Sequence, residues 1–115
     1  KVKDIMIKKE DCCVIDKNST LLYTIKEMNI KQTGIAIIED NGNIEGIITN
    51  RDLFKYIEKN NNITYSVEDL INKNYYYIDD DELYIKDVKK MYTYIPVVKN
   101  KKLLGIFDQS IYEFK

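Results

Sequence analysis

The 115-residue sequence contains no histidine, and this absence limits the chemistry open to the chain. Histidine is the commonest acid and base near neutral pH and a frequent zinc ligand. The remaining residues offer no pairing of a nucleophile with a base and no cluster with metal-ligand spacing. The sequence therefore predicts a protein that is not an enzyme, has no metal site and requires no cofactor.

Cysteine is scarce as well, since the chain has only two and they are adjacent, Cys12 and Cys13. Neighbouring side chains on a strand point to opposite faces, so a disulfide between them would need strained geometry. We expect two reduced thiols, one in the core and the other near the surface. Reduced thiols are typical of a cytoplasmic protein, which is the predicted location.

The sequence has no apolar run long enough to span a bilayer, and its first residues lack a signal-peptide pattern. Its 18 basic and 19 acidic residues give a formal net charge of −1. Such a charge exerts no global attraction on nucleic acid or anionic lipid, so direct binding to either is not expected. Because the chain starts at Lys1 without a methionine, we expect a piece of a longer polypeptide, although trimming of a whole small protein would leave the same start.

The most informative feature that is present is a pattern that occurs twice. The paired segments are 2–6 and 67–71, 15–16 and 78–79, 35–38 and 95–98, and 46–47 and 105–106. A period near sixty residues, present only twice, is too long and too few for a solenoid. We expect a first motif over residues 1–59, a linker over 60–66, and a shortened, degenerate second motif over 67–115.

Hydrophobic spacing and turn residues predict the same order of elements in each half. In the first half these are a short helix at 2–6, a strand at 13–15, an amphipathic helix that follows the cap-type residues 16–19 and reaches Met28, hairpin strands at 33–38 and 44–48, and a last helix from Thr49. In the second half they are a short helix at 67–71, a strand at 76–78, a helix over 79–91, hairpin strands at 95–99 and 103–107, and a final helix.

Two details of the second half carry their own expectations. Tyr84, Ile85, Val88 and Met91 recur at helical spacing and should form the buried stripe of the helix over 79–91. The acidic run 79–82 lacks the spacing and the glycine of a calcium loop, so we expect it to cap that helix. The predicted fold class is α+β, with two pseudo-symmetric β-α-β-β-α halves packed through their sheets into one compact domain.

The order of the elements, together with several short motifs, resembles the CBS domain, and two such units in tandem resemble a CBS pair, or Bateman module. The motifs are Asp4-Ile5-Met6, the junction from Gly46 to Leu53, Ile95-Pro96-Val97-Val98 and Leu104-Gly105-Ile106. The resemblance covers nearly the whole chain. It implies a regulatory module that binds an adenosine-containing ligand in a cleft, controls an attached or partner effector domain of a longer protein, and forms a homodimer.

The resemblance also implies which residues bind the ligand. Asp52 would receive the ribose hydroxyls and Thr49 would face the phosphate. Arg51, with Asn50 in the same turn, either adds a charged contact to the phosphate or lies in solvent. The positions that match the adenine slot are Ile7, Cys13, Ile35 and Ala36, with Lys8 at the rim. A different interpretation of Thr49 and Asp52 is open, because Thr-x-x-Asp before an apolar run also forms a capping box.

The second half departs from the family pattern where a ligand would bind. Asp108 stands at the Thr position and Ile111 at the Asp position. A carboxylate would repel a phosphate, and isoleucine cannot bind a ribose. We therefore expect one functional site in the first half and a vestigial second cleft. AMP, ADP or ATP is the favoured ligand, and S-adenosylmethionine is possible. The alternative is a ligand-free module for dimerisation or interaction.

Overall fold

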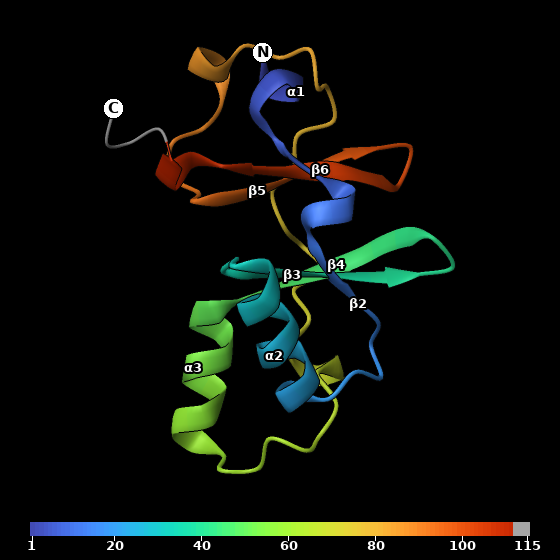
Figure 1. The fold of residues 1–115 in the computed structure, drawn as a ribbon, viewed down its shortest axis with the longest axis vertical. Helices are drawn as coiled ribbons and strands as arrows, with labels where there is room; N and C mark the ends of the chain where they lie inside the picture. Colours follow the sequence, from blue (N-terminus) through green and yellow to red (C-terminus); the bar gives the residue numbers. More distant parts are fainter. Residues whose placement is uncertain (112–115) are drawn as a thin grey trace. The chain divides into compact units, whose positions relative to one another are not determined.

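The computed structural model describes residues 1–111, which fall into two compact units. Unit 1 joins Lys1–Cys12 to the chain from Tyr76 onward, and unit 2 is Cys13–Tyr75. Each unit contains one three-stranded sheet (Figure 1), so the predicted α+β class is confirmed. The motif boundaries proposed from sequence similarity remain a prediction, because the units group the first twelve residues with the second half of the chain.

Unit 2 has the elements predicted for most of the first half, which are β2 (Cys13–Ile15), α2 (Leu21–Lys31), β3 (Ile35–Asp40), β4 (Asn43–Thr49) and α3 (Asn50–Lys59). It also contains the 3₁₀ turn η2 (Glu68–Leu70), where the sequence predicted the short first helix of the second half. The sheet order is β2-β3-β4, with β2 parallel and β4 antiparallel to β3. Both α2 and α3 lie on the same face of this sheet (Figure 1). Among the described residues, no helix is long and apolar enough to cross a membrane.

The helix α2 shows how local signals set the bounds of these elements. It begins after Thr20, whose hydroxyl accepts the N–H of Tyr23 at 3.0 Å, so the cap lies just after the predicted residues 16–19. It ends at Gln32, which has a left-handed backbone (φ 54°). Leu21 and Met28 on its buried face join the core cluster of unit 2.

Unit 1 contains α1 (Val2–Ile5), β1 (Ile7–Lys8), the 3₁₀ turn η1 (Lys9–Asp11), the 3₁₀ turn η3 (Ile85–Asp87), β5 (Tyr94–Lys99), β6 (Lys102–Asp108) and the 3₁₀ turn η4 (Gln109–Ile111). Its sheet order is β1-β6-β5, and both pairings are antiparallel. The sequence did not indicate β1, which is only two residues long. The final helix expected in this half is represented by η4, and residues 112–115 lie outside the described residues.

The helix predicted over 79–91 is wrong, because this segment forms turns and the short η3. The Asp80 carboxylate accepts the N–H of Glu82 at 3.0 Å, and the Asp80 carbonyl accepts the N–H of Leu83 at 3.1 Å. Local bonds of this kind compete with a helix. Two residues of the expected stripe are exposed, Tyr84 at 57% and Met91 at 76%.

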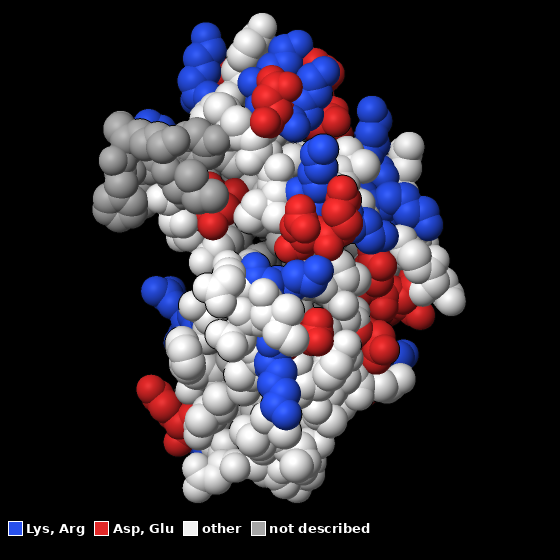
Figure 2. Space-filling view, viewed as in Figure 1, with Lys and Arg blue, Asp and Glu red and all other residues white. Residues whose placement is uncertain are grey.

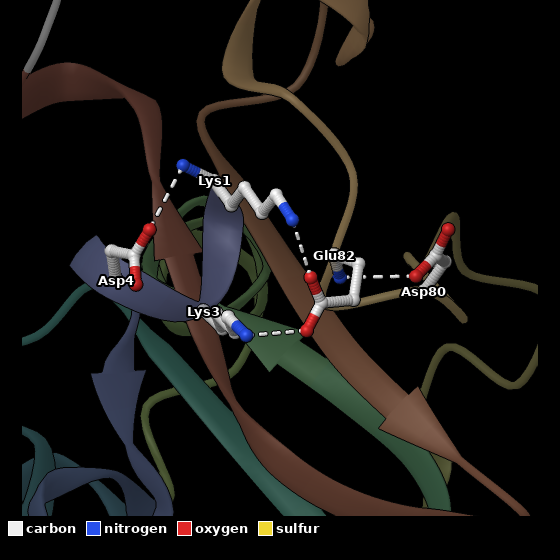
Figure 3. A network of polar contacts seen from close by, with 5 residues as sticks. All are labelled: Lys1, Lys3, Asp4, Asp80 and Glu82. Carbon is white, nitrogen blue, oxygen red and sulfur yellow. Dashed lines mark hydrogen bonds and ion pairs between the residues drawn. The ribbon is translucent and has the colours of Figure 1, made fainter.

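Two predictions for the neighbouring residues are also wrong, because the helix over 79–91 does not form. The acidic run 79–82 caps no helix, and its Glu82 is instead bound by the ammonium groups of Lys1 and Lys3 (Figure 3). The strand expected at 76–78 is reduced to one bridge, between Ile78 and Val97. The connection before Ile95 is three residues shorter than its counterpart before Ile35, which leaves less chain for a strand and a helix.

A buried amide fixes the non-helical path of this segment. The side chain of Gln109 is 8% exposed, and its Nε2 donates to the carbonyls of Lys89 and Tyr92, both at 2.6 Å. The backbone N–H of Gln109 donates to the carbonyl of Thr93 at 2.8 Å. One residue therefore provides hydrogen-bond donors for three backbone carbonyls of the non-helical segment before β5.

Both cysteines are buried, so the expectation that one lies near the surface is wrong. Cys12 is 4% exposed and its thiol donates to the carbonyl of Lys8 at 3.3 Å, within unit 1. Cys13 is 1% exposed and packs in the core of unit 2. The boundary between the two units is the peptide bond between Cys12 and Cys13. The two thiols are therefore buried in different units.

Candidate functional site

The first turn of α3 brings together four of the predicted site residues. Thr49 is the N-cap, with an extended backbone (φ −96°, ψ 161°), and Asp52 is the third residue of the helix. The Asp52 carboxylate oxygen Oδ2 accepts the backbone N–H of Thr49 at 3.1 Å and its hydroxyl at 3.0 Å. The Thr49 hydroxyl oxygen accepts the N–H of Asp52 at 3.4 Å. The capping box that the sequence left open is therefore formed.

The strands position this turn. Thr49 ends β4 and pairs with Ile35 at the start of β3, and the N–H of Asn50 donates to the carbonyl of Gly34 at 2.9 Å. The side chain of Asp52 is half-buried, whereas Asn50 and Arg51 are exposed. The turn therefore presents a carboxylate held by its neighbours beside a guanidinium in solvent.

The predicted slot residues are divided between the two units. Cys13, Ile35 and Ala36 lie in unit 2, where Cys13 pairs with Ala36 across β2 and β3. All three are 0–1% exposed, and burial raises the pKa of the Cys13 thiol to about 11, so this thiol remains protonated. Ile7 and Lys8 form β1 of unit 1, with Ile7 half-buried and Lys8 exposed.

A groove between α2 and α3 was missed by the sequence analysis. Its volume is about 310 Å³, and it is lined by Ile25, Met28, Asn29, Gln32, Thr33, Asn50, Leu53, Phe54 and Ile57. Phe54 is 64% exposed beside it, and the face drawn in Figure 2 carries few charges over these two helices. The only available signal was Phe54 itself, an aromatic residue on the apolar side of a surface helix.

The sequence model of the CBS domain family matches residues 2–59. The chain belongs to the CBS domain family. It is 34% identical over 103 residues to the carnitine transport ATP-binding protein OpuCA of Listeria monocytogenes. That alignment covers 84% of this chain and 25% of the transport protein, so the chain spans about a quarter of that relative's length.

Solved structures of CBS proteins share the whole fold. CBSX2 of Arabidopsis thaliana in complex with AMP superposes with a TM-score of 0.76 at 20% identity, over 95% of this chain and 90% of that one. The CBS domain pair of protein MJ0100, solved with 5′-methylthioadenosine and S-adenosylmethionine, gives a TM-score of 0.77 at 24% identity, over 98% and 92%. The chain is thus a CBS pair, or Bateman module, as the resemblance predicted.

Proposed function

We propose that this CBS pair is a regulatory module that senses an adenine nucleotide, AMP, ADP or ATP, through the first turn of α3. The observation that carries the proposal is the Asp52 carboxylate, held by Thr49 at the end of a Gly-Ile-Ile strand, as in the family motif. A carboxylate can accept two hydrogen bonds from a vicinal diol such as a ribose. The other proposed contacts are Asn50, Arg51, Ile35, Ala36, Cys13, Ile7 and Lys8.

The relatives support an adenosine-containing ligand and an attached effector. CBSX2 is solved with AMP, and MJ0100 with 5′-methylthioadenosine and S-adenosylmethionine, so the latter is the second ligand to test. OpuCA is a transport ATP-binding protein of which this chain matches a quarter. We propose that the chain likewise regulates an attached or partner domain in the cytoplasm, without catalysis of its own.

Regulation would follow from a shift between conformations. A ligand changes an equilibrium only by its differential affinity for the two states. A nucleotide that binds one arrangement of a homodimer more tightly would favour that arrangement, and the effector domain would respond to it. The proposal requires no enzymatic turnover and no bound metal.

Thermal unfolding with and without ligand tests the proposal. A nucleotide at a hundredfold its dissociation constant should add about 2.7 kcal/mol to the free energy of unfolding. The Asp52→Ala variant should lose this gain, whereas Asp11→Ala, at an exposed carboxylate of unit 1, should keep it. Absence of any shift with AMP, ADP, ATP or S-adenosylmethionine, or a full shift in Asp52→Ala, would refute the proposal.

The groove between α2 and α3 favours a second candidate, a homodimerisation module that binds no ligand. An exposed Phe54 beside an apolar groove is a surface that a second copy could cover. Sedimentation equilibrium would detect the dimer, and Phe54→Ser should dissociate it. Dimers without nucleotide binding in calorimetry would favour this candidate over the sensor.

A further inference from the structure

We propose that Asn41 is a site of spontaneous covalent modification, at which the side-chain amide is lost and the chain gains a carboxylate. The reaction is deamidation through a succinimide, and it needs no enzyme and no reactant other than water. The inference is independent of nucleotide sensing, and it concerns the hairpin turn between β3 and β4. It makes this turn a place where the protein changes chemically with age.

The reaction begins at the backbone nitrogen of Gly42. After losing its proton, this nitrogen attacks the side-chain carbonyl carbon of Asn41, a new N–C bond closes a five-membered succinimide ring, and the side-chain nitrogen leaves as ammonia. Water then opens the ring at one of its two carbonyls. Opening at the side-chain carbonyl gives aspartate, whereas opening at the backbone carbonyl gives isoaspartate, in which the main chain passes through Cβ and Cγ. The sum is one water consumed and one ammonia released.

The sequence provides the required neighbour only once, because Asn41-Gly42 is the single Asn-Gly pair in the chain. Glycine has no Cβ, so nothing hinders the approach of its nitrogen to the side chain before it. Each of the other asparagines precedes a residue with a side chain. The smallest of these successors is Ser19, after Asn18, and its N–H already donates to the carbonyl of Asp16 at 3.1 Å. Asn41 is therefore the asparagine most open to attack.

The structure leaves this pair accessible. Asn41 and Gly42 are both exposed, at the tip of the hairpin that the pair Asp40 and Asn43 closes. Among residues 1–111, no hydrogen bond is made by the side chain of Asn41 or by the N–H of Gly42. Exposed loop tips open locally at little cost in free energy, so the turn can reach the conformation in which the ring closes.

The turn between β5 and β6 supplies a comparison within the same chain. Asn100 has the same φ of 52° as Asn41, and the next residue is again left-handed, Lys101 at 66° and Gly42 at 80°. Both turns are exposed, and in both hairpins the strands are paired up to the turn. The two asparagines differ in the side chain of the next residue, which at Lys101 hinders the attacking nitrogen. We expect Asn41 to react and Asn100 to persist.

The product should weaken the hairpin in two ways. A two-residue turn of this kind depends on its short loop and left-handed angles, so the additional backbone carbon of isoaspartate does not fit it. The new carboxylate also joins those of Asp16 and Glu39 in the lining of a cavity of about 320 Å³, to which Asn41 contributes. Like charges that share a site repel. The modified hairpin should therefore be less stable than the original.

Peptide mapping by mass spectrometry after incubation at pH 9 tests the inference. In the wild type, the peptide that contains residue 41 should convert to its aspartate and isoaspartate forms, while the peptide that contains Asn100 should not change. Lys101→Gly should make Asn100 react at a rate close to that of Asn41, and Gly42→Lys should protect Asn41. The reaction should be slower at pH 6, because the attacking nitrogen has to lose its proton.

The chain unfolded in guanidinium chloride is the reference for a fully open turn. Conversion of Asn41 in the unfolded chain but not in the folded protein would overturn the inference, because the fold would then protect the turn. An unchanged Asn100 in Lys101→Gly, or another asparagine that reacts faster than Asn41, would overturn it as well. Asn41→Asp, which carries the charge of the product, should unfold at a lower urea concentration than the wild type. Equal midpoints would contradict the expected effect on the hairpin.

Discussion

Gly105 on β6 lies directly against the backbone of Ile7 on β1. A Cβ atom at Gly105 would overlap the carbonyl oxygen of Ile7 and lie 3.2 Å from the sulfur of Met6. Gly46 has the same relationship in unit 2, where a Cβ would lie 2.6 Å from the carbonyl oxygen of Asn72. In each unit, the residues that follow a short helix (α1 or η2) lie against a glycine of the sheet, where there is no side chain to prevent the contact.

Alanine at either glycine should therefore destabilise its unit. At each glycine a backbone carbonyl oxygen is in the way, that of Ile7 or of Asn72, and it cannot move as a flexible side chain could; at Gly46 the Ile71 side chain is in the way as well. Overpacking of this kind costs about 1–3 kcal/mol. We expect Gly105→Ala and Gly46→Ala each to lower the free energy of unfolding by this amount, measured by urea denaturation.

The control for this pair is Lys102→Ala, at an exposed position of β6. Exposed substitutions away from such contacts change stability by no more than about 0.5 kcal/mol. A Gly105→Ala variant as stable as Lys102→Ala would show that β1 does not approach β6 so closely in solution.

The buried amide of Gln109 should be important for stability. Replacement by leucine keeps the apolar stem but removes the donors to the carbonyls of Lys89 and Tyr92. The two hydrogen bonds are partly buried, and a typical hydrogen bond contributes about 0.5–1.5 kcal/mol to stability. We expect Gln109→Leu to lower the unfolding free energy by about 2 kcal/mol, and amide exchange over 85–93 to accelerate.

Asn50 provides the matched control, because it occupies the corresponding position of unit 2. Its N–H donates to the carbonyl of Gly34 as that of Gln109 donates to Thr93, but its side chain is exposed. Asn50→Leu should therefore stay within about 0.5 kcal/mol of wild type. Equal losses in the two variants would mean that the side-chain amide of Gln109 does not account for its effect.

Exchanging the residues at the second turn position of the two hairpins, Gly42 and Lys101, should change stability in opposite directions. Asn41 and Gly42 have φ of 52° and 80°, while Asn100 and Lys101 have 52° and 66°. A left-handed backbone conformation costs a residue with a Cβ about 1–2 kcal/mol. Glycine avoids this steric cost, but it loses more conformational entropy on folding, which offsets about half of the gain. Lys101→Gly should raise stability by about 0.5 kcal/mol and Gly42→Lys should lower it, by thermal unfolding. A stabilising Gly42→Lys would contradict this account.

The helices and strands of unit 2 could be predicted from the sequence because several independent features, namely helix caps, an apolar strand and a turn motif, indicate the same elements. Thr20 and Thr49 are effective caps, the run at 35–38 is wholly apolar, and Asn41-Gly42 favours a hairpin turn. Unit 1 was harder because helical spacing alone does not make a helix. Residues 84–91 have that spacing, but the bonds of Asp80 and Gln109 hold the chain in turns.

The candidate site shows the same limits. Thr49 and Asp52 were identifiable from a four-residue motif, including the alternative that they form a capping box, which the structure contains. The groove between α2 and α3 was not identifiable, because it depends on how two helices lie on a sheet. The burial of both cysteines was also missed, since it follows from the passage of the chain between units at residues 12 and 13.

Glu82 should make the stability of unit 1 depend on pH in acid. Hydrogen bonds from the ammonium groups of Lys1, at 2.7 Å, and Lys3 lower the pKa of its carboxyl from 4.5 to about 2 (Figure 3). A pKa that is lower in the folded state means that the unfolded chain binds more protons. The stabilisation should therefore be complete above pH 4.5 and be lost as the pH falls through about 2.

The measurement is the free energy of unfolding between pH 6 and 2, compared with that of Glu82→Gln. The difference between the two proteins should shrink as the pH falls through this window, and high salt should reduce it because the residues are exposed. In Lys3→Ala the Glu82 carboxyl, followed by NMR, should titrate nearer to its ordinary pKa. A Glu82 carboxyl that titrates near 4.5 in the wild type would show that the two lysines do not hold it in solution.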